Sequence, residues 1–454
     1  MIWFLVALFL IGLALALQAG IVAFAGYVLL GVYLLSRYLA RRWAEDLTAE
    51  RQCDSSPREI GDTLEVVVTL RNTGGLPILW VLVEDLIPEQ ALRKSSMLTV
   101  KGKRIHVANL RPRQTKPVKY KITFEMRGYY PIGPTMLETG DVFGLHRRHR
   151  VVGNPVYIMV YPKVLPLPKY DFASQRPVGE VRLQNRLFED VTRTAGVRQY
   201  QIGDPMSRIH WRATARTGEL HSRIFEPTSL AGATILVDFH TAGYHSRGEP
   251  HRSDLAVTTA ASIAYAISIL NQQLGLASNG RDAADRIREE SLEKNGGPGQ
   301  PEFETRESAR SKYELLEDSD RIRPVTVDTR RGIDQFQKIR EALARLELSD
   351  GLSFAQLVLE MAARMPRDAT LIAILPRVPV ETAVALGTLR RQGFAIAAIL
   401  IGLDESEKIE AHGRLLAETI RDIRYVNTEA ELMNLGGGAG GPVASAYAID
   451  VPLA

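Results

Sequence analysis

The sequence of 454 residues contains a single cysteine, Cys53, so no disulfide can form within the chain. No group of cysteine and histidine residues has the spacing of a zinc site. Three enzyme motifs are also missing: the G-x-S-x-G nucleophile elbow, the H-E-x-x-H metalloprotease motif and the G-x-x-x-x-G-K-[ST] phosphate loop. We therefore expect a protein without enzymatic activity and without a bound cofactor.

An excess of charge of either sign is lacking too. The chain has 56 Lys and Arg residues against 52 Asp and Glu residues, a net charge of +4. Because this difference is small, we expect no nucleic-acid partner. Hydrophobic residues make up 45% of the chain and charged residues 24%, which is typical of globular proteins. At about 100–200 residues per domain, the length indicates more than one domain.

The first 36 residues contain no Asp, Glu, Lys or Arg. A single helix of this length would measure about 54 Å, which exceeds the roughly 30 Å hydrocarbon core of a bilayer. We therefore predict two membrane-spanning helices, Met1–Leu17 and Ile21–Leu39, joined by a tight turn. Three arginines close the second helix: Arg37, Arg41 and Arg42. By the positive-inside rule they keep that end in the cytoplasm, so a hairpin in contact with membrane lipid leaves the following domains cytoplasmic.

A secretory signal peptide is the alternative interpretation of the same segment. Ala14-Leu15-Ala16 resembles a cleavage site. However, no basic residue precedes the apolar run, and a second apolar run follows at once. These two features favour the hairpin, with residues 1–46 forming the hairpin and the juxtamembrane segment.

Residues 47–166 alternate apolar and polar side chains in several short runs, as in Leu64–Leu70 and Val118–Phe124. Period-two alternation predicts β-strands with one buried face. Glycine-rich and proline-rich turns, such as those at Gly74-Gly75 and Gly133-Pro134, separate the runs. We predict an antiparallel β-sandwich that serves as a scaffold or a binding surface.

Residues 167–435 change to short, continuously apolar runs that alternate with helical patterns. Thr370–Leu375 and Ala395–Ile401 are such runs. They predict a parallel sheet covered by helices on both faces, so the fold class is α+β multidomain with an α/β domain at this point. Residues 279–324 are rich in charge and poor in large apolar side chains, and predict a flexible insertion. The glycine-rich residues 436–454 predict a flexible tail.

The densest motif lies at the start of the α/β region, from Arg198 to Arg216. Asp204 is placed to cap a helix that runs from Pro205 to Thr217 and ends at Gly218. On that helix Arg208, Arg212 and Arg216 would share one face at i, i+4 and i+8, while Ile209 and Trp211 would turn inward. This face either binds phosphates, lipid headgroups or an acidic partner, or is a solvated face paired with carboxylates of the same domain.

The motif resembles the hallmark of a family of bacterial membrane proteins, the domain-of-unknown-function 58 family. The pattern R-x-Y-x-x-G-D, followed by W and A-R, is matched by Arg198, Tyr200, Gly203, Asp204, Trp211 and Arg216, with Arg208 and Arg212 between them. Gly140–Leu145, Val160–Pro162 and Gly275–Gly280 also match the family. The resemblance implies a von Willebrand factor type A-like (Rossmann-like) domain carried on a β-domain and anchored in the bacterial inner membrane. It also implies a MoxR-type AAA+ ATPase as partner, and no assigned reaction.

The resemblance directs attention to one metal site. Type A domains that bind Mg²⁺ hold it with D-x-S-x-S after the first strand, a loop hydroxyl and a later acid. In this sequence Asp238 is kept, but His240 and Ala242 replace the two serines. Ser353 could supply the loop oxygen, whereas Arg377 stands where an acid is expected. We therefore expect a degenerate site that binds no metal, with Asp238 as a structural acceptor for loop amides.

Together these observations predict a membrane-anchored, non-enzymatic interaction or assembly protein that acts with the ATPase. One alternative is an enzyme of the same assembly, of transglutaminase or peptidase type, although Cys53 lacks an obvious histidine partner. The other is a binder of nucleic acid or lipid headgroups through Arg208, Arg212 and Arg216.

Overall fold

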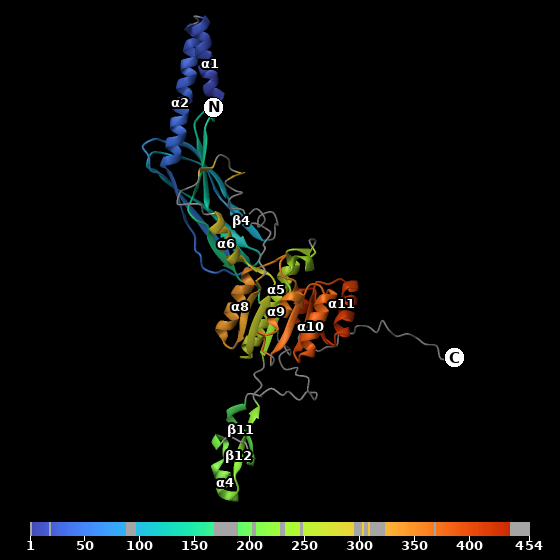
Figure 1. The fold of residues 1–454 in the computed structure, drawn as a ribbon. Coiled ribbons are helices and arrows are strands. Elements are labelled where there is room, and N and C mark those ends of the chain that lie inside the picture. The colour runs from blue at the N-terminus through green and yellow to red at the C-terminus, as the bar shows by residue number, and fades with distance from the viewer. Residues whose placement is uncertain are drawn as a thin grey trace, which may run out of the picture. The chain divides into compact units, whose positions relative to one another are not determined.

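The computed structural model describes residues 2–17, 20–87, 97–167, 189–201, 206–227, 232–245, 248–294, 302–303, 307–308, 323–366 and 369–435. The chain forms two compact units (Figure 1). Unit 1 comprises Met1–Lys163, Gly280–Val325 and Arg340–Gly351. Unit 2 comprises Val164–Asn279, Thr326–Ile339 and Leu352–Ala454.

Unit 1 begins with two apolar helices, α1 (Ile2–Leu17) and α2 (Gly20–Asp46), which pack against each other. The ring centroids of Phe4 and Tyr33 are 5.7 Å apart. At Gly26 a Cβ atom would lie 2.6 Å from Cγ1 of Ile11, so glycine permits the close approach of the two helices. By length and composition α2 is able to cross a membrane, whereas the apolar stretch Phe4–Leu13 of α1 is shorter. One such helix near an N-terminus is also typical of a signal sequence.

Two antiparallel sheets follow in unit 1. The first has the order β1-β2-β6-β4, and the second β16-β9-β8-β3-β5. The strands of the first sheet are β1 (Leu47–Gln52), β2 (Thr63–Asn72), β6 (Thr115–Phe124) and β4 (Leu98–Gly102). Those of the second are β16 (Glu302–Phe303), β9 (Arg147–Val152), β8 (Thr135–Gly140), β3 (Ile78–Asp85) and β5 (Ile105–Leu110). Two further antiparallel pairs are β7 (Gly128–Ile132) with β10 (Val156–Val160), and β15 (Arg281–Asp282) with β18 (Leu346–Glu347).

Both sheets contribute side chains to one hydrophobic core. Val66 and Val68 of β2 lie in it beside Val81 and Val83 of β3, and all four are at most 2% exposed. Along β2, buried positions alternate with exposed or half-buried ones, as the period-two sequence pattern predicts. The predicted antiparallel strands of residues 47–166 are therefore present, and they pack as two facing layers.

A buried polar network joins the two layers. Asp85 on β3 accepts a hydrogen bond from the Tyr120 hydroxyl on β6 at 2.7 Å and another from the Thr135 hydroxyl on β8. The Arg51 Nε atom on β1 lies 3.5 Å from Asp85 Oδ2, and both side chains are at most 5% exposed. Burial, followed by the neighbouring Asp85 charge, raises the pKa of Tyr120 far above its usual value, so this phenol remains a donor.

We expect Asp85→Ala to destabilise unit 1 by about 3–5 kcal/mol, because the substitution leaves the Arg51 charge buried without its partner. The control is Glu65→Ala, which removes an exposed partner of Lys119 and should cost about 0–1 kcal/mol. Chemical denaturation of the detergent-solubilised chain measures both. It is followed by tryptophan fluorescence in a Trp211→Phe background, in which the remaining tryptophans, Trp3, Trp43 and Trp80, all belong to unit 1. Equal costs for the two variants would contradict a role for the inter-sheet network.

Unit 2 is built on a six-stranded sheet with the order β17-β14-β13-β19-β20-β21. The strands are β17 (Val325–Arg330), β14 (Gln273–Ser278), β13 (Gly232–Val237), β19 (Thr370–Leu375), β20 (Ala395–Ile401) and β21 (Asp422–Val426). The pairs from β14 through β21 are parallel, as predicted from the apolar runs. Numbered along the chain, the order is 3-2-1-4-5-6, which is that of a doubly wound α/β sheet.

Helices cover this sheet (Figure 1). They are α5 (His251–Ile269), α8 (Ile333–Arg345), α9 (Phe354–Met361), α10 (Val380–Arg391), α11 (Glu405–Ala417) and α12 (Glu429–Met433). Alternate strand residues, such as Leu236 and Ala373, form one core with α9, α10 and α11. Helix α5 contacts β13, β14, β19 and β20 outside that core, so helices lie on both faces. This arrangement explains why both faces of the strands are apolar.

The predicted flexible insertion starts too early in the sequence. Asn279 is 2% exposed, and β15 and α6 (Ala283–Lys294) follow it directly. The prediction is wrong for residues 279–294 because they form β15 and α6. Ion pairs of Arg281, Asp282 and Arg286 hold this charged segment together with the buried side chains of Ala283 and Ile287. Most of residues 295–322, and the predicted tail at 436–454, lie outside the described residues.

Candidate functional site

The arginine-rich motif occupies a small group of elements in unit 2. Strand β11 (Glu189–Gln199) pairs antiparallel with β12 (His221–Pro227), and between them lie the 3₁₀ helix η1 (Met206–Arg208) and helix α4 (Trp211–Thr217). Ile209 bridges to Ser222 of β12 and is 2% exposed, as expected for an inward side chain. The motif therefore sits on one hairpin-like pair of strands.

Helix α4 is shorter than predicted. Its N-cap is His210, whose Nδ1 atom accepts a hydrogen bond from the Ala213 amide at 3.0 Å. It ends where predicted, at Gly218, which has φ of +77° and donates to the Thr214 carbonyl at 2.9 Å. The predicted start at Pro205 is wrong, since the described chain is 3₁₀ helix and a bridge before Trp211. Gly203 and Asp204 lie outside the described residues.

The later start changes which arginines share a face. Arg208 lies in η1, so the predicted stripe of three arginines on one helix is wrong. Arg212 and Arg216 remain at i and i+4 on α4, and both are exposed. Within the described part of the chain neither has an ion pair. Arg198 on β11 is half-buried opposite Ser222, and the Tyr200 amide donates to the Leu220 carbonyl at 2.8 Å, so these two motif residues hold the strand pair.

Trp211 is 65% exposed, which contradicts its predicted inward orientation. No residue of α4 is buried. Trp211, Arg212 and Arg216 thus form an exposed surface, here called the α4 patch. Exposed apolar side chains lie on the adjoining segments: Met206, Leu220 and Val197. Tryptophan and arginine are the residue types most enriched among the energetically dominant residues of protein interfaces.

The second candidate is the carboxyl edge of the unit 2 sheet, where doubly wound folds bind ligands. Asp238 follows β13 and is 5% exposed. Its Oδ1 atom accepts hydrogen bonds from Asn279 Nδ2 at 2.9 Å and from the His240 amide at 3.2 Å. Asn279, which follows β14, also donates to the Leu352 carbonyl and accepts from the Phe239 amide. The Asp238 carboxylate thus accepts hydrogen bonds from residues that follow β13 and β14.

The other two residues of the predicted degenerate metal site have structural tasks. The His240 Nδ1 atom accepts from the Ala242 amide and caps η2 (Thr241–Gly243). The Ser353 hydroxyl accepts from the Gln356 amide in a capping box at the start of α9. Burial raises the pKa of Asp238, and the hydrogen bonds from Asn279 and His240 lower it only in part. Among the described residues there is no group of three or more His, Cys, Asp or Glu that could hold a metal ion.

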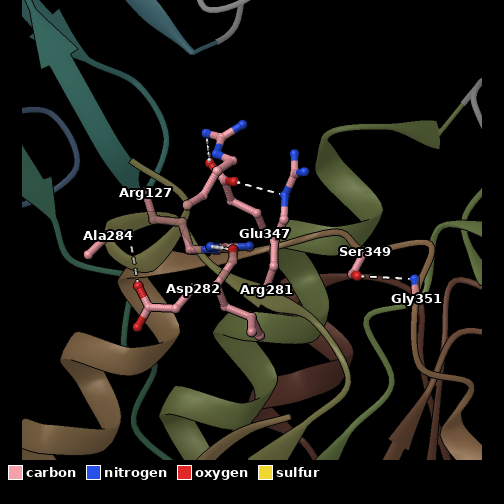
Figure 2. Close-up of polar contacts among 9 residues, drawn as sticks. Arg127, Arg281, Asp282, Ala284, Glu347, Ser349 and Gly351 are labelled. Carbon is pink, nitrogen blue, oxygen red and sulfur yellow. Dashed lines mark hydrogen bonds and ion pairs between the residues drawn. The ribbon is translucent and has the colours of Figure 1, made fainter. Parts of the chain in front are cut away.

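A third charged cluster lies in unit 1 (Figure 2). Glu347 accepts from Arg286 at 2.7 Å and lies 3.2 Å from Arg281 Nε. Asp282 accepts from Arg345 with both oxygens, at 3.1 Å each, and from the Ala284 amide. Arg127 donates to the Leu343 and Leu346 carbonyls. Each carboxylate has a partner in the chain, so the cluster holds distant segments of unit 1 together. The sequence did not predict this cluster, because Arg281, Asp282 and Arg286 fall within the predicted insertion.

Cys53 bears on the enzyme alternative. It follows β1 and is half-buried. Burial raises the pKa of its thiol, so the nucleophilic thiolate is disfavoured. This environment is that of a structural cysteine rather than an activated nucleophile.

Comparisons with known proteins match the region of the motif to one family model. Residues 196–291, which span the α4 patch, β13 and β14, match the family described as "Protein of unknown function DUF58". The chain is similar to "Uncharacterized protein YeaD" of Bacillus subtilis (strain 168), with 26% identity over 269 residues, or 58% of this chain and 64% of the relative. The chain thus spans slightly less than two thirds of the length of that relative.

Solved structures show only weak likeness. The CARDB domain of the PF1109 protein from Pyrococcus furiosus is 19% identical with a TM-score of 0.18, covering 25% of this chain and 92% of that domain. A GH20 exo-β-N-acetylglucosaminidase from Vibrio harveyi is 9% identical with a TM-score of 0.16, covering 78% of this chain and 82% of the enzyme. Scores this low define neither fold nor function.

A pair of substitutions at Asp238 tests its role as a structural acceptor. Asp238→Ala removes the acceptor and should destabilise the ends of β13 and β14 by about 1–3 kcal/mol. Asp238→Asn keeps an acceptor oxygen and loses the buried charge, so we expect it to be neutral or stabilising at pH 7. Because burial raises the pKa, wild-type stability is fully present below the unfolded-state pKa of about 3.9 and is lost as pH rises through the folded-state pKa.

Amide hydrogen exchange of β13 and β14 measures these effects locally. The advantage of Asp238→Asn over wild type should grow as pH rises above the unfolded-state value. If Asn destabilises as much as Ala at neutral pH, the carboxylate has a task beyond accepting these two hydrogen bonds.

Proposed function

We propose that this chain is a non-enzymatic interaction protein of the DUF58 family, anchored in the bacterial inner membrane, whose α4 patch docks a MoxR-type AAA+ ATPase. The observation that carries the proposal is the exposed Trp211 beside Arg212 and Arg216, within the segment that matches the family. An assembly role is favoured because Asp238, His240 and Ser353, the residues of the predicted metal site, already form hydrogen bonds within the chain. The type A-like assignment of unit 2 draws support from its strand order and from Asp238 after β13.

The chemistry of the α4 patch favours an acidic partner surface with an apolar residue. The planar guanidinium of arginine binds carboxylates in a bidentate manner. A surface that only needs to be soluble could use lysine equally well. Trp211 offers a large rigid apolar area at a low entropic cost. A partner that buries Trp211 and pairs with both guanidinium groups would therefore be held by the residue types that dominate interface energies.

The anchor rests on α2 and on the charges that follow its apolar run. Arg37, Arg41 and Arg42 are exposed at that end of the helix. Because positive residues remain on the cytoplasmic side, both units would face the cytoplasm, where an ATP-dependent partner also resides. Helix α1 would carry the chain outward across the bilayer as the first arm of the proposed hairpin, and α2 would return it.

Charge reversal in the α4 patch tests the docking proposal. Arg212→Glu with Arg216→Glu should weaken capture of the ATPase by at least about tenfold, because both guanidinium partners become repulsive. Trp211→Ala should do the same without loss of folding, since this side chain is 65% exposed. The matched control is Arg364→Glu with Arg421→Glu, which makes the same charge change at exposed positions elsewhere in unit 2.

Pull-down with the detergent-solubilised full chain, with folding checked by circular dichroism, compares these variants. Unchanged capture by the folded patch variants would overturn the patch as the docking surface. If the variants instead lose binding to anionic vesicles and keep the ATPase, the patch binds lipid headgroups. If the control variant loses as much capture of the ATPase, the change in net charge explains the effect of the patch variants.

Fusions to topology reporters test the anchor. Alkaline phosphatase fused after residue 454 should be inactive, and a fluorescent protein fused there should be bright, because the arginines after Ser36 hold that end inside. A fusion after residue 18, between the helices, should give the opposite pair of results. Active phosphatase at residue 454 would refute the cytoplasmic orientation.

A further inference from the structure

A short loop beside α2 carries two exposed apolar side chains. It joins β8 to β9 and comprises residues 141–146. Val142 is 56% exposed and Phe143 63% exposed. Asp141 shapes the turn, because its carboxylate accepts hydrogen bonds from the Phe143 amide at 2.9 Å and the His146 amide at 2.6 Å. The structure therefore holds these two apolar side chains outward on a fixed turn.

Contacts with α2 fix the position of this loop along the helix. The His146 Nδ1 atom lies 3.0 Å from the Ser36 hydroxyl, and its ring makes an edge contact with Tyr33 at 5.0 Å. Four residues later, Arg150 donates to the Ala44 carbonyl. Ser36 and Ala44 are about 12 Å apart along a helix. Strand β9 thus follows the last turns of α2, and the loop lies at the end of β9 nearest the charge-free run.

The surroundings of the loop are those of a membrane interface. The charge-free run ends at Ser36, and Leu34 and Leu35 beside it are more than half exposed. Tyr38, in the next turn, is also exposed, and tyrosine is enriched at the boundary between lipid and water. Exposed basic side chains begin at the same level with Arg37 and continue with Arg41 and Arg147. Such a band attracts anionic headgroups.

We propose that the loop of residues 141–146 is a second membrane contact, which inserts Val142 and Phe143 into the headgroup and acyl boundary beside α2. The proposal rests on the membrane anchor of the proposed function. It adds a contact of the β-strand region of unit 1 with the bilayer, so that the unit is held by the helical hairpin and by a loop. Apolar side chains on a rigid turn, flanked by arginines, match the chemistry of an interface with anionic lipid.

An environment-sensitive fluorophore tests the insertion. In a Cys53→Ser background, Phe143→Cys or Val142→Cys is labelled with NBD, and the full chain is reconstituted in vesicles of phosphatidylethanolamine and phosphatidylglycerol. The matched control is Leu76→Cys, at an exposed apolar residue in the turn where the Thr73 amide donates to the Asp46 carbonyl. Asp46 lies about 15 Å beyond Ser36 along α2, on the polar side.

At positions 142 and 143 we expect NBD emission shifted to shorter wavelength and quenched by doxyl-labelled lipid, with neither effect at position 76. If the chain floats with the vesicles but all three positions emit as in water, the loop contact is wrong while the anchor stands. If NBD emission at position 143 shifts to shorter wavelength but doxyl-labelled lipid does not quench it, protein rather than lipid covers the loop. That result would also overturn the proposal. A chain that does not float would overturn the anchor and the loop contact together.

Discussion

The hydrogen bond between Asn279 and Asp238 holds the carboxyl edge of the sheet in unit 2. It joins the ends of β13 and β14 at the edge where a doubly wound sheet binds ligands. A buried carboxylate without partners would cost several kcal/mol, so the amides of Asn279 and His240 must occupy it. The Asp238 carboxylate is then occupied by its own loops. The proposed docking therefore relies on exposed groups elsewhere in unit 2. Trp211 and the arginines of α4 are such groups.

In unit 1, buried and half-buried charges also hold segments of the chain together. Asp85 is shared by residues of both sheets, and Glu347 lies between two arginines of the segment that follows Asn279. Such pairs add little net stability over apolar packing, because desolvation offsets most of their attraction. They do specify which segments meet, because a mispaired buried charge is heavily penalised. The charged stretch after β14 is therefore placed by its ion pairs.

Much of the fold could be predicted from the sequence because its signals were local. The strands Thr370–Leu375 and Ala395–Ile401 have the predicted bounds, since continuous apolar runs between helical patterns define them directly. The candidate site could be located from the sequence, but its geometry could not be predicted. Asp204 satisfied the usual preference for an N-cap, yet His210 caps α4, directly after the bridge between Ile209 and Ser222. A later helix start turned Trp211 outward, and no pattern within the motif contains this information.

Because no side chain of α4 is buried, its two caps control how much of the helix is formed. A seven-residue helix is marginal in water on its own, so the His210 and Gly218 caps and the contacts with β12 maintain it. The apparent affinity for a partner that recognises the folded patch is the intrinsic affinity multiplied by the fraction of molecules in which α4 is formed. A change at His210, which need touch no partner, would therefore weaken the proposed recognition through the helix population alone.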